Sequence, residues 1–226
     1  MKKKAGVIVI LCYVISIIAM TYLNIAVEKA VLISIIFLIA AFFTLFETGN
    51  MDAKTMAAVA TMSALGGVLR IPFAAIPGLQ PVTFICAVSG LTLGPVNGFM
   101  VGNMCAFISN FFLGHGPWTL WQMMGWGLCG AFFGIFQNKS DKIEGKPFTV
   151  LLGIWGYIFG IILDQWYIVQ AAIPITIKIE LVGIAASFPV DTVHAVGNVF
   201  FAALFGKNVI KALKRYTMKN KVEYMD

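Results

Sequence analysis

Apolar runs of close to 20 residues recur along most of this 226-residue chain. A helix of about 20 apolar residues crosses a bilayer core roughly 30 Å thick. Only 12% of the residues are charged and the mean hydropathy is +0.90, whereas a soluble domain carries roughly 25% charged residues. The composition excludes a soluble globular domain and predicts an all-α polytopic membrane protein.

The runs predict about eight spans in two groups. A two-helix N-terminal hairpin, residues 1–50, turns at Glu28-Lys29 and precedes a six-helix core, residues 51–216, and a short polar tail, residues 217–226. The first run is longer than a signal-peptide core and no cleavage site follows, which favours a retained helix. The expected spans are 5–27, 30–46, 53–69, 81–93, 96–113, 118–136, 148–167 and 188–212.

Basic residues gather at 2–4, 139–146 and 207–221. Cytoplasmic loops of membrane proteins carry an excess of Lys and Arg, and an even number of spans puts all three clusters on that side. Both termini are therefore expected in the cytoplasm. No nucleic acid partner is expected, because the chain has no soluble basic face.

Residues 69–136 are apolar enough for lipid, yet they carry polar side chains and Gly-Pro breaks near the ends of short spans. Polar groups and broken helices are tolerated at membrane depth only where protein or a water-filled cavity surrounds them. This pattern predicts a binding cavity that opens to the outer side.

Arg70 ends the third span beside a restricted loop with Pro72, Pro77, Gly78 and Pro81. A cation beside a rigid loop suits an anionic or polar ligand. An arginine that only extends to the headgroups is the alternative.

Asn103 and Asn110 lie seven residues apart and share one face of their predicted helix. Asn110, near the next outer turn, is a ligand candidate, whereas Asn103 is expected to bond to another helix. Trp118 and Gln122 lie four apart, and an apolar ring beside an amide suits a planar heterocycle. His115 is either a pH-sensitive contact or a solvated turn residue.

Asp191, His194 and Asn198 form one polar stripe on the last helix. Asp191 and His194 are either cavity groups or a structural pair. Residues 167–187 are expected to form an interfacial or capping segment, or to lie on the headgroups.

The sequence shows no nucleophile constellation, no P-loop and no metal-ligand spacing, so no catalysis, cofactor or metal is expected. The four cysteines lie in apolar spans and are interpreted as small core residues. A stripe of small residues on the third span allows close helix approach, either inside the bundle or for a second membrane subunit. Its members are Ala53, Ala57, Ala60 and Ala64.

The order of motifs resembles the substrate-binding S component of energy-coupling factor (ECF) transporters. After the alanine-rich helix and Arg70 come QPVTF, SGLTLGP, SNFFLGHGPWT, WQMMGWGLCG and FPVDTVHAVGN. The GPWTxWQ block is similar to the subgroup assigned to cobalamin or its precursors. The N-terminal hairpin departs from the six-helix family pattern.

The resemblance implies a vitamin-sized cargo bound near the outer face of a bacterial cell membrane. It also implies a transmembrane coupling subunit, two cytoplasmic ATPases, no enzymatic activity, and docking through the alanine stripe. The expected substrate contacts are Arg70, Gln80, Asn110, His115, Trp118, Gln122, Asp164, Asp191 and His194.

Three other hypotheses are open: an S component for another heterocyclic vitamin or nucleoside, a membrane-embedded enzyme that uses Asp191 and His194, and an autonomous carrier or channel. Inverted repeats would favour the carrier, and the sequence shows none.

Overall fold

The computed structural model describes residues 2–23, 25–47, 52–170 and 176–218, and the part it describes is helical without strands. The prediction of an all-α polytopic membrane protein is confirmed. The elements are α1 Lys2–Tyr22, α2 Val27–Glu47, α3 Ala53–Phe73, α4 Val82–Leu93, α5 Pro95–Leu113, α6 Trp118–Ile135, η1 Gln137–Lys139, α7 Ser140–Ile143, α8 Lys146–Gln170 and α9 Ile177–Met218.

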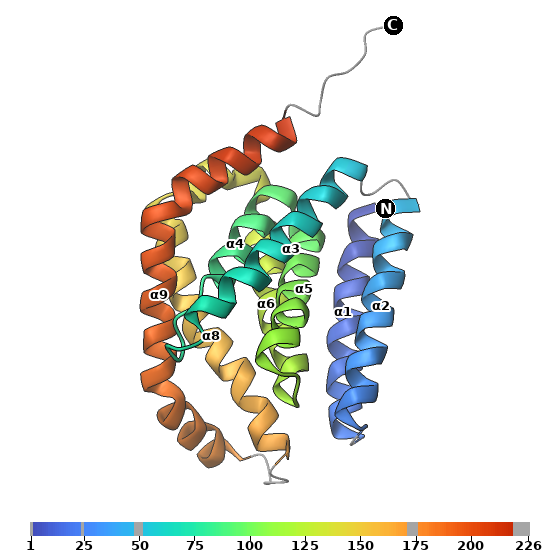
Figure 1. Cartoon of the computed structure of the whole chain (residues 1–226), viewed down its shortest axis with the longest axis vertical. Helices are drawn as coiled ribbons and strands as arrows, with labels where there is room; N and C mark the ends of the chain where they lie inside the picture. Colours follow the sequence, from blue (N-terminus) through green and yellow to red (C-terminus); the bar gives the residue numbers. More distant parts are fainter. Residues whose placement is uncertain (1, 24, 48–51, 171–175, 219–226) are drawn as a thin grey trace, which may run out of the picture.

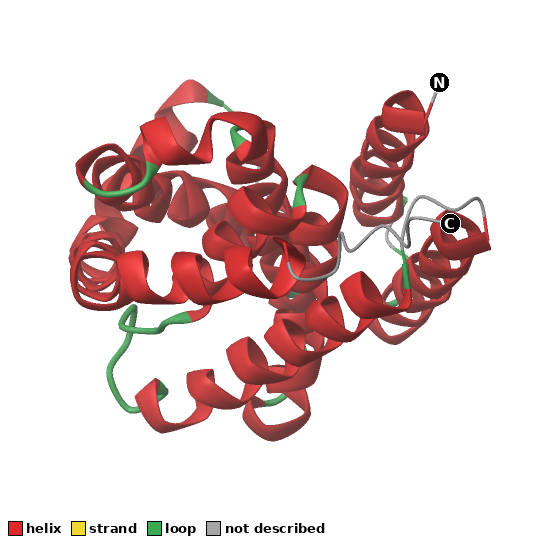
Figure 2. Ribbon diagram, turned by 90° about the horizontal axis from the view of Figure 1, so that it is seen from above, coloured by secondary structure: helices red, strands yellow, loops and turns green. Residues whose placement is uncertain are grey.

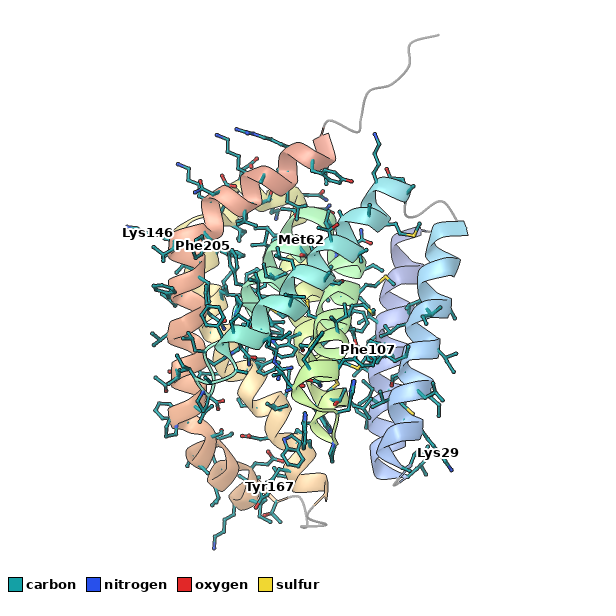
Figure 3. All side chains as sticks on the ribbon, viewed as in Figure 1. Lys29, Met62, Phe107, Lys146, Tyr167 and Phe205 are labelled. Carbon is teal, nitrogen blue, oxygen red and sulfur yellow. The ribbon has the colours of Figure 1, made fainter. Side chains whose placement is uncertain are left out.

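The helices α1 and α2 form a hairpin that stands to one side of the other helices (Figures 1 and 2). The start of α1 and the end of α9 lie at the same end of the bundle (Figure 1). Lys146 also lies at that end, whereas Lys29 and Tyr167 lie at the opposite one (Figure 3). The basic clusters therefore share one end, as an even number of crossings requires.

Four described helices are long and apolar enough to cross a membrane: Ala53–Phe73, Pro95–Leu113, Lys146–Ile168 and Ile177–Thr217. The helix α4 has 12 residues, so at 1.5 Å per residue it spans about 18 Å, less than the roughly 30 Å of a bilayer core. The α3–α4 connection accordingly stops short of the lower ends of α8 and α9 in Figure 1. The expected outer loop after Arg70 is thus recessed into the bundle.

Close glycine contacts lock α4, α5 and α6 together. A Cβ added at Gly130 would overlap the carbonyl oxygen of Gly98, and one added at Gly90 would overlap that of Gly130. A third contact sets Gly102 against the backbone of Trp126. Small residues at helix crossings let backbones approach closely, so these three helices form the rigid centre that positions the site.

Two predicted boundaries are wrong. Glu28 and Lys29 lie in the first turn of α2, since that helix begins at Val27. The last helix begins at Ile177, not near residue 188, and continues through Pro189. Glu180 accepts a hydrogen bond from Gln165 of α8 at 2.9 Å, which accommodates a charged residue inside the helix. The expected segment 167–187 is therefore the end of α8 and the start of α9, with residues 171–175 outside the described part.

Candidate functional site

The site begins with Arg70, in the last turns of α3. Its Nε donates to Gln80 Oε1 at 2.9 Å, and its Nη1 donates to Ser109 Oγ at 2.8 Å and Asn110 Oδ1 at 2.7 Å. The ion pairs of the described residues join Lys214 to Asp141 and Glu144, so no carboxylate there neutralises Arg70. Arg70 is half-buried and its three hydrogen-bond partners are neutral, so its positive field stays available inside the bundle.

A chain of amides extends from Arg70 into α6. Asn110 donates through Nδ2 to Thr119 Oγ1 at 3.1 Å and to Gln122 Oε1 at 2.9 Å. Asn110 is 1% exposed and Gln122 is 7% exposed. Buried amides need hydrogen-bond partners, and here they find them in one another.

Aromatic rings form the other side of the site. The Arg70 guanidinium carbon lies 5.0 Å from the centre of the Trp126 ring. Phe159 of α8 stacks on Trp126, with ring centres 4.8 Å apart, and also on His194 at 5.1 Å. A cation over an indole face gains energy when both are shielded from water.

A directed hydrogen-bond chain ties these rings to the α3–α4 connection. Trp126 Nε1 donates to Thr83 Oγ1 at 3.0 Å, and His194 contacts Thr83 Oγ1 through Nε2 at 2.9 Å and the Gly78 carbonyl through Nδ1 at 2.8 Å. Because a carbonyl only accepts, the proton of His194 lies on Nδ1, and the Thr83 hydroxyl donates to Nε2. Gly78 has φ +82°, a backbone conformation that favours glycine.

All six helices of the core contribute to this one assembly, which we call the Arg70 cluster. The helix α3 gives Arg70, α4 gives Thr83, and α9 gives His194, while α5, α6 and α8 give amides and rings. The cluster comprises Arg70, Gln80, Thr83, Ser109, Asn110, Thr119, Gln122, Trp126, Phe159 and His194.

Five of the nine predicted contacts therefore lie together: Arg70, Gln80, Asn110, Gln122 and His194. Sequence reasoning missed the other members of the cluster. Trp126 follows Gln122 by four residues and so shares its helical face, which is the signal that identifies it. Phe159 carries no such signal, because a Phe in an apolar span is typical of core packing.

Two predicted contacts, Asp164 and Asp191, form a separate group. Ser187 Oγ lies 2.8 Å from Asp164 Oδ2 and 2.7 Å from Asp191 Oδ2. Asp191 also packs against Gly160, where a Cβ would overlap its carboxylate. Asp191 and His194 do not bond to each other: Asp191 bonds to Ser187 of its own helix, whereas His194 bonds to Thr83 of α4 and to the Gly78 carbonyl.

The last two predicted contacts, His115 and Trp118, lie at the α5–α6 turn. Trp118 packs edge-on against Trp166 at 5.7 Å, and none of the hydrogen bonds or ring contacts of the described residues joins Trp118 to the Arg70 cluster. His115 is exposed and lies against the ring of Phe111 at 5.2 Å. Partial burial lowers the pKa of His115, which leaves it neutral at pH 7.

Other predicted residues are placed as follows. Ala53, Ala57, Ala60 and Ala64 are all exposed on α3, so this stripe is not consumed by packing inside the described bundle. Asn103 donates to Phe99 O of its own helix at 2.8 Å rather than to another helix. Asn198 donates to Leu152 O of α8 at 3.3 Å.

Two apolar crevices flank the cluster. One, of about 300 Å³, lies between the hairpin and the core and is lined by Leu38, Val59, Ala60 and Met104 among others. The second, of about 400 Å³, lies between α9 and the α3–α4 connection, where Leu79 faces Gly197. Both have apolar walls, in contrast to the polar Arg70 cluster.

Comparison with known proteins gives a family match and several similar proteins. Residues 50–215 match the family model described as ECF-type riboflavin transporter, S component. A UPF0397 protein of Aliivibrio fischeri is 31% identical over 124 residues, which cover 49% of this chain and 67% of the relative. A UPF0397 protein of Vibrio vulnificus is 28% identical over 179 residues, covering 74% and 93%.

No solved structure gives a significant match. The family match covers all six core helices and every member of the Arg70 cluster. Members of this family are substrate-binding subunits of transporters and not enzymes. The chain belongs to the ECF-type riboflavin transporter S component family.

Proposed function

We propose that this protein is the membrane subunit that captures a heterocyclic vitamin for an ECF importer, and that the Arg70 cluster receives the cargo. The observation that carries the proposal is the convergence of all six core helices on one polar and aromatic cluster that holds an unneutralised arginine. Polar groups gathered at membrane depth mark a substrate path more often than a structural device.

Two cargo candidates follow from different observations. A flavin-like flat heterocycle is supported by the riboflavin named in the family description. Cobalamin or a cobalamin precursor is supported by the resemblance of the GPWTLWQ block, residues 116–122, to the cobalamin subgroup.

Delivery requires partners. The exposed stripe of Ala53, Ala57, Ala60 and Ala64 is the surface we assign to the transmembrane coupling subunit, through which two ATPases would drive reorientation and inward release. The basic end of the bundle, with Lys146, is assigned to the cytoplasm. Both termini then face the ATPases, and the α5–α6 turn faces outward.

The test is equilibrium binding of riboflavin and of cyanocobalamin to the chain in lipid nanodiscs. We expect saturable binding of one of them, weakened at least about tenfold by Arg70→Met and unchanged by the control Arg215→Met at the exposed end of α9. Asp191→Asn and Trp118→Phe should leave affinity within about threefold.

Two results would refute the proposal. One is the absence of binding together with no uptake of either vitamin when the chain is expressed with a coupling module. The other is a loss on Asp191→Asn as large as the loss on Arg70→Met, which would move the cargo site to the Asp164–Asp191 group.

A further inference from the structure

Arginine fixes the orientation of the amides around it. A guanidinium donates hydrogen bonds and accepts none. The Gln80 atom 2.9 Å from Arg70 Nε and the Asn110 atom 2.7 Å from Nη1 must therefore be oxygens. This assignment follows from chemistry and does not depend on how the two amide ends are distinguished.

The orientation propagates one residue further. With its oxygen turned to Arg70, Asn110 presents its NH₂ group to α6. Both hydrogens of that group are used, one on Thr119 Oγ1 and one on Gln122 Oε1. The atom of Gln122 that faces Asn110 is therefore also an oxygen, and the NH₂ group of Gln122 points away from Asn110.

Three side-chain nitrogens of the cluster keep N–H groups that no residue of the described chain uses. Arg70 Nη2, Gln80 Nε2 and Gln122 Nε2 make no hydrogen bond within the described part of the chain, and each carries two hydrogens. Each of the three amide oxygens in the cluster already accepts one bond and keeps one lone pair, so spare hydrogens outnumber spare lone pairs on these groups. The fully buried side-chain atoms without partners lie on other residues. These three nitrogens therefore keep access to a ligand.

We infer that the cargo presents an acceptor-rich edge, with carbonyl, carboxylate or phosphate oxygens, to the spare N–H groups of Arg70, Gln80 and Gln122. This inference rests on the proposed function and adds a chemical class to it. A site of donors rejects a ligand edge of donors, because hydrogens would then face hydrogens and the buried groups would stay unpaired.

Two flat three-ring probes of similar size separate the possibilities. Lumichrome carries two carbonyl oxygens on its pyrimidine ring, and diaminophenazine, which is also uncharged at pH 7, carries two amino groups on an outer ring. In equilibrium dialysis against nanodiscs of zwitterionic lipid, corrected with empty nanodiscs, the chain should retain lumichrome and not diaminophenazine. Equal retention of both probes, or no retention of lumichrome, would overturn the inference.

A substitution tests the donors directly. Gln122→Glu has nearly the same shape and keeps an oxygen for Asn110, but it replaces the spare N–H groups with a second oxygen. Lumichrome binding should fall at least about tenfold. Asn208→Asp makes the same chemical change on the exposed surface of α9 and should leave binding unchanged. Wild-type affinity in Gln122→Glu would overturn the inference, and Gln80→Glu repeats the test at a less buried position.

Failure of the proposed function has a different signature. Suppose that lumichrome binds and that Gln122→Glu weakens its binding, but no vitamin accumulates in cells that also express a coupling module. The importer role is then wrong, and the inference of an acceptor-rich ligand edge is kept. If a vitamin accumulates and Gln122→Glu transports it normally, the importer role stands and the acceptor edge is wrong.

Discussion

Arg70 and Trp126 lie face to face at the centre of the bundle, with the guanidinium carbon 5.0 Å from the ring centre. Each residue also begins a branch of hydrogen bonds that ends on the α3–α4 connection. Arg70 bonds directly to Gln80, and Trp126 reaches Gly78 through Thr83 and His194. The cation–π contact thus joins two anchors of the same eight-residue connection, 74–81. In the proposed function, a cargo that engages Arg70 would also act on this segment.

Trp126→Phe and Trp126→Leu separate the two roles of the indole. Phe keeps a ring beneath Arg70 but leaves the Thr83 hydroxyl without its donor, so we expect a loss of about 1–2 kcal/mol in stability. Leu also removes the aromatic face and leaves a cavity, with an expected loss of about 3–5 kcal/mol. Thermal unfolding in detergent measures both. Trp118→Phe, at the α5–α6 turn, is the control, and a loss there as large as in Trp126→Leu would contradict the central role of Trp126.

His194→Asn tests the anchor on Gly78. Asn can still donate to the Gly78 carbonyl but cannot also reach Thr83, so a buried hydroxyl loses its acceptor at a cost of about 1–3 kcal/mol. His194→Leu removes both bonds. Hydrogen–deuterium exchange over residues 74–80 should accelerate more in the Leu variant than in the Asn variant. The exposed His115→Asn should change neither stability nor exchange, and unchanged exchange in His194→Leu would show that the anchor does not hold this segment.

The sequence predicted most helix boundaries because charged or Gly-Pro residues bound the apolar runs on both sides. It failed at the start of α9, where Lys178 and Glu180 suggested a break. A helix tolerates those charges near its first turns when a neighbour such as Gln165 pairs with one of them. The start of α9 also carries a local signal, because Thr176 Oγ1 caps the helix by accepting from the Ile179 backbone N–H at 3.3 Å. The contact with Gln165, in contrast, is tertiary and cannot be seen in the local sequence.

The candidate site was predictable where a polar residue interrupts an apolar span, as with Asn110 and Gln122, because such a group must find a partner. It was not predictable for Phe159, which has the pattern of a core residue, whereas the four-residue spacing from Gln122 was the one signal for Trp126. The sequence also did not show that the side chains of Asp191 and His194 bond to different partners. Residues three apart on a helix differ by about 60° in direction, which is enough to face different neighbours.

Gly130→Ala should disrupt the rigid centre of the bundle. The added methyl group would overlap the carbonyl oxygen of Gly98 on α5, so α5 and α6 must separate, at an expected cost of about 3 kcal/mol or more. Gly183→Ala is the matched control, because its nearest neighbour is the Ile168 side chain at 3.9 Å. We expect that variant to be neutral or slightly stabilising, as alanine favours a helix. Equal melting temperatures for the two variants would contradict the close packing of α4, α5 and α6.

Asp52 should make the stability of the start of α3 depend on pH. Its carboxylate caps the helix by accepting from the Thr55 backbone N–H at 2.8 Å, and the hydrogen bonds from Thr55 lower the pKa of Asp52. A lowered folded-state pKa means that the cap contributes fully above the unfolded value of about 3.9 and is lost as the pH falls through the folded value. Asp52→Ala should cost about 1 kcal/mol at pH 7. Asp52→Asn keeps an acceptor that does not titrate, so the stability difference between wild type and Asp52→Asn should shrink between pH 6 and pH 3. A constant difference across that range would contradict the cap.

Ala60→Leu tests whether the exposed stripe on α3 is the surface for the coupling subunit. A Leu there adds three carbon atoms to a face that must approach another helix closely, and small residues dominate such contacts in membranes. We expect co-purification with a tagged coupling subunit to fall at least about tenfold, while binding of the cargo to the isolated chain is unchanged, because Ala60 makes no contact in the Arg70 cluster. Ala203→Leu places the same bulk on an exposed position of α9 and should preserve both properties. If Ala60→Leu and Ala203→Leu assemble equally well, the coupling subunit docks on another face.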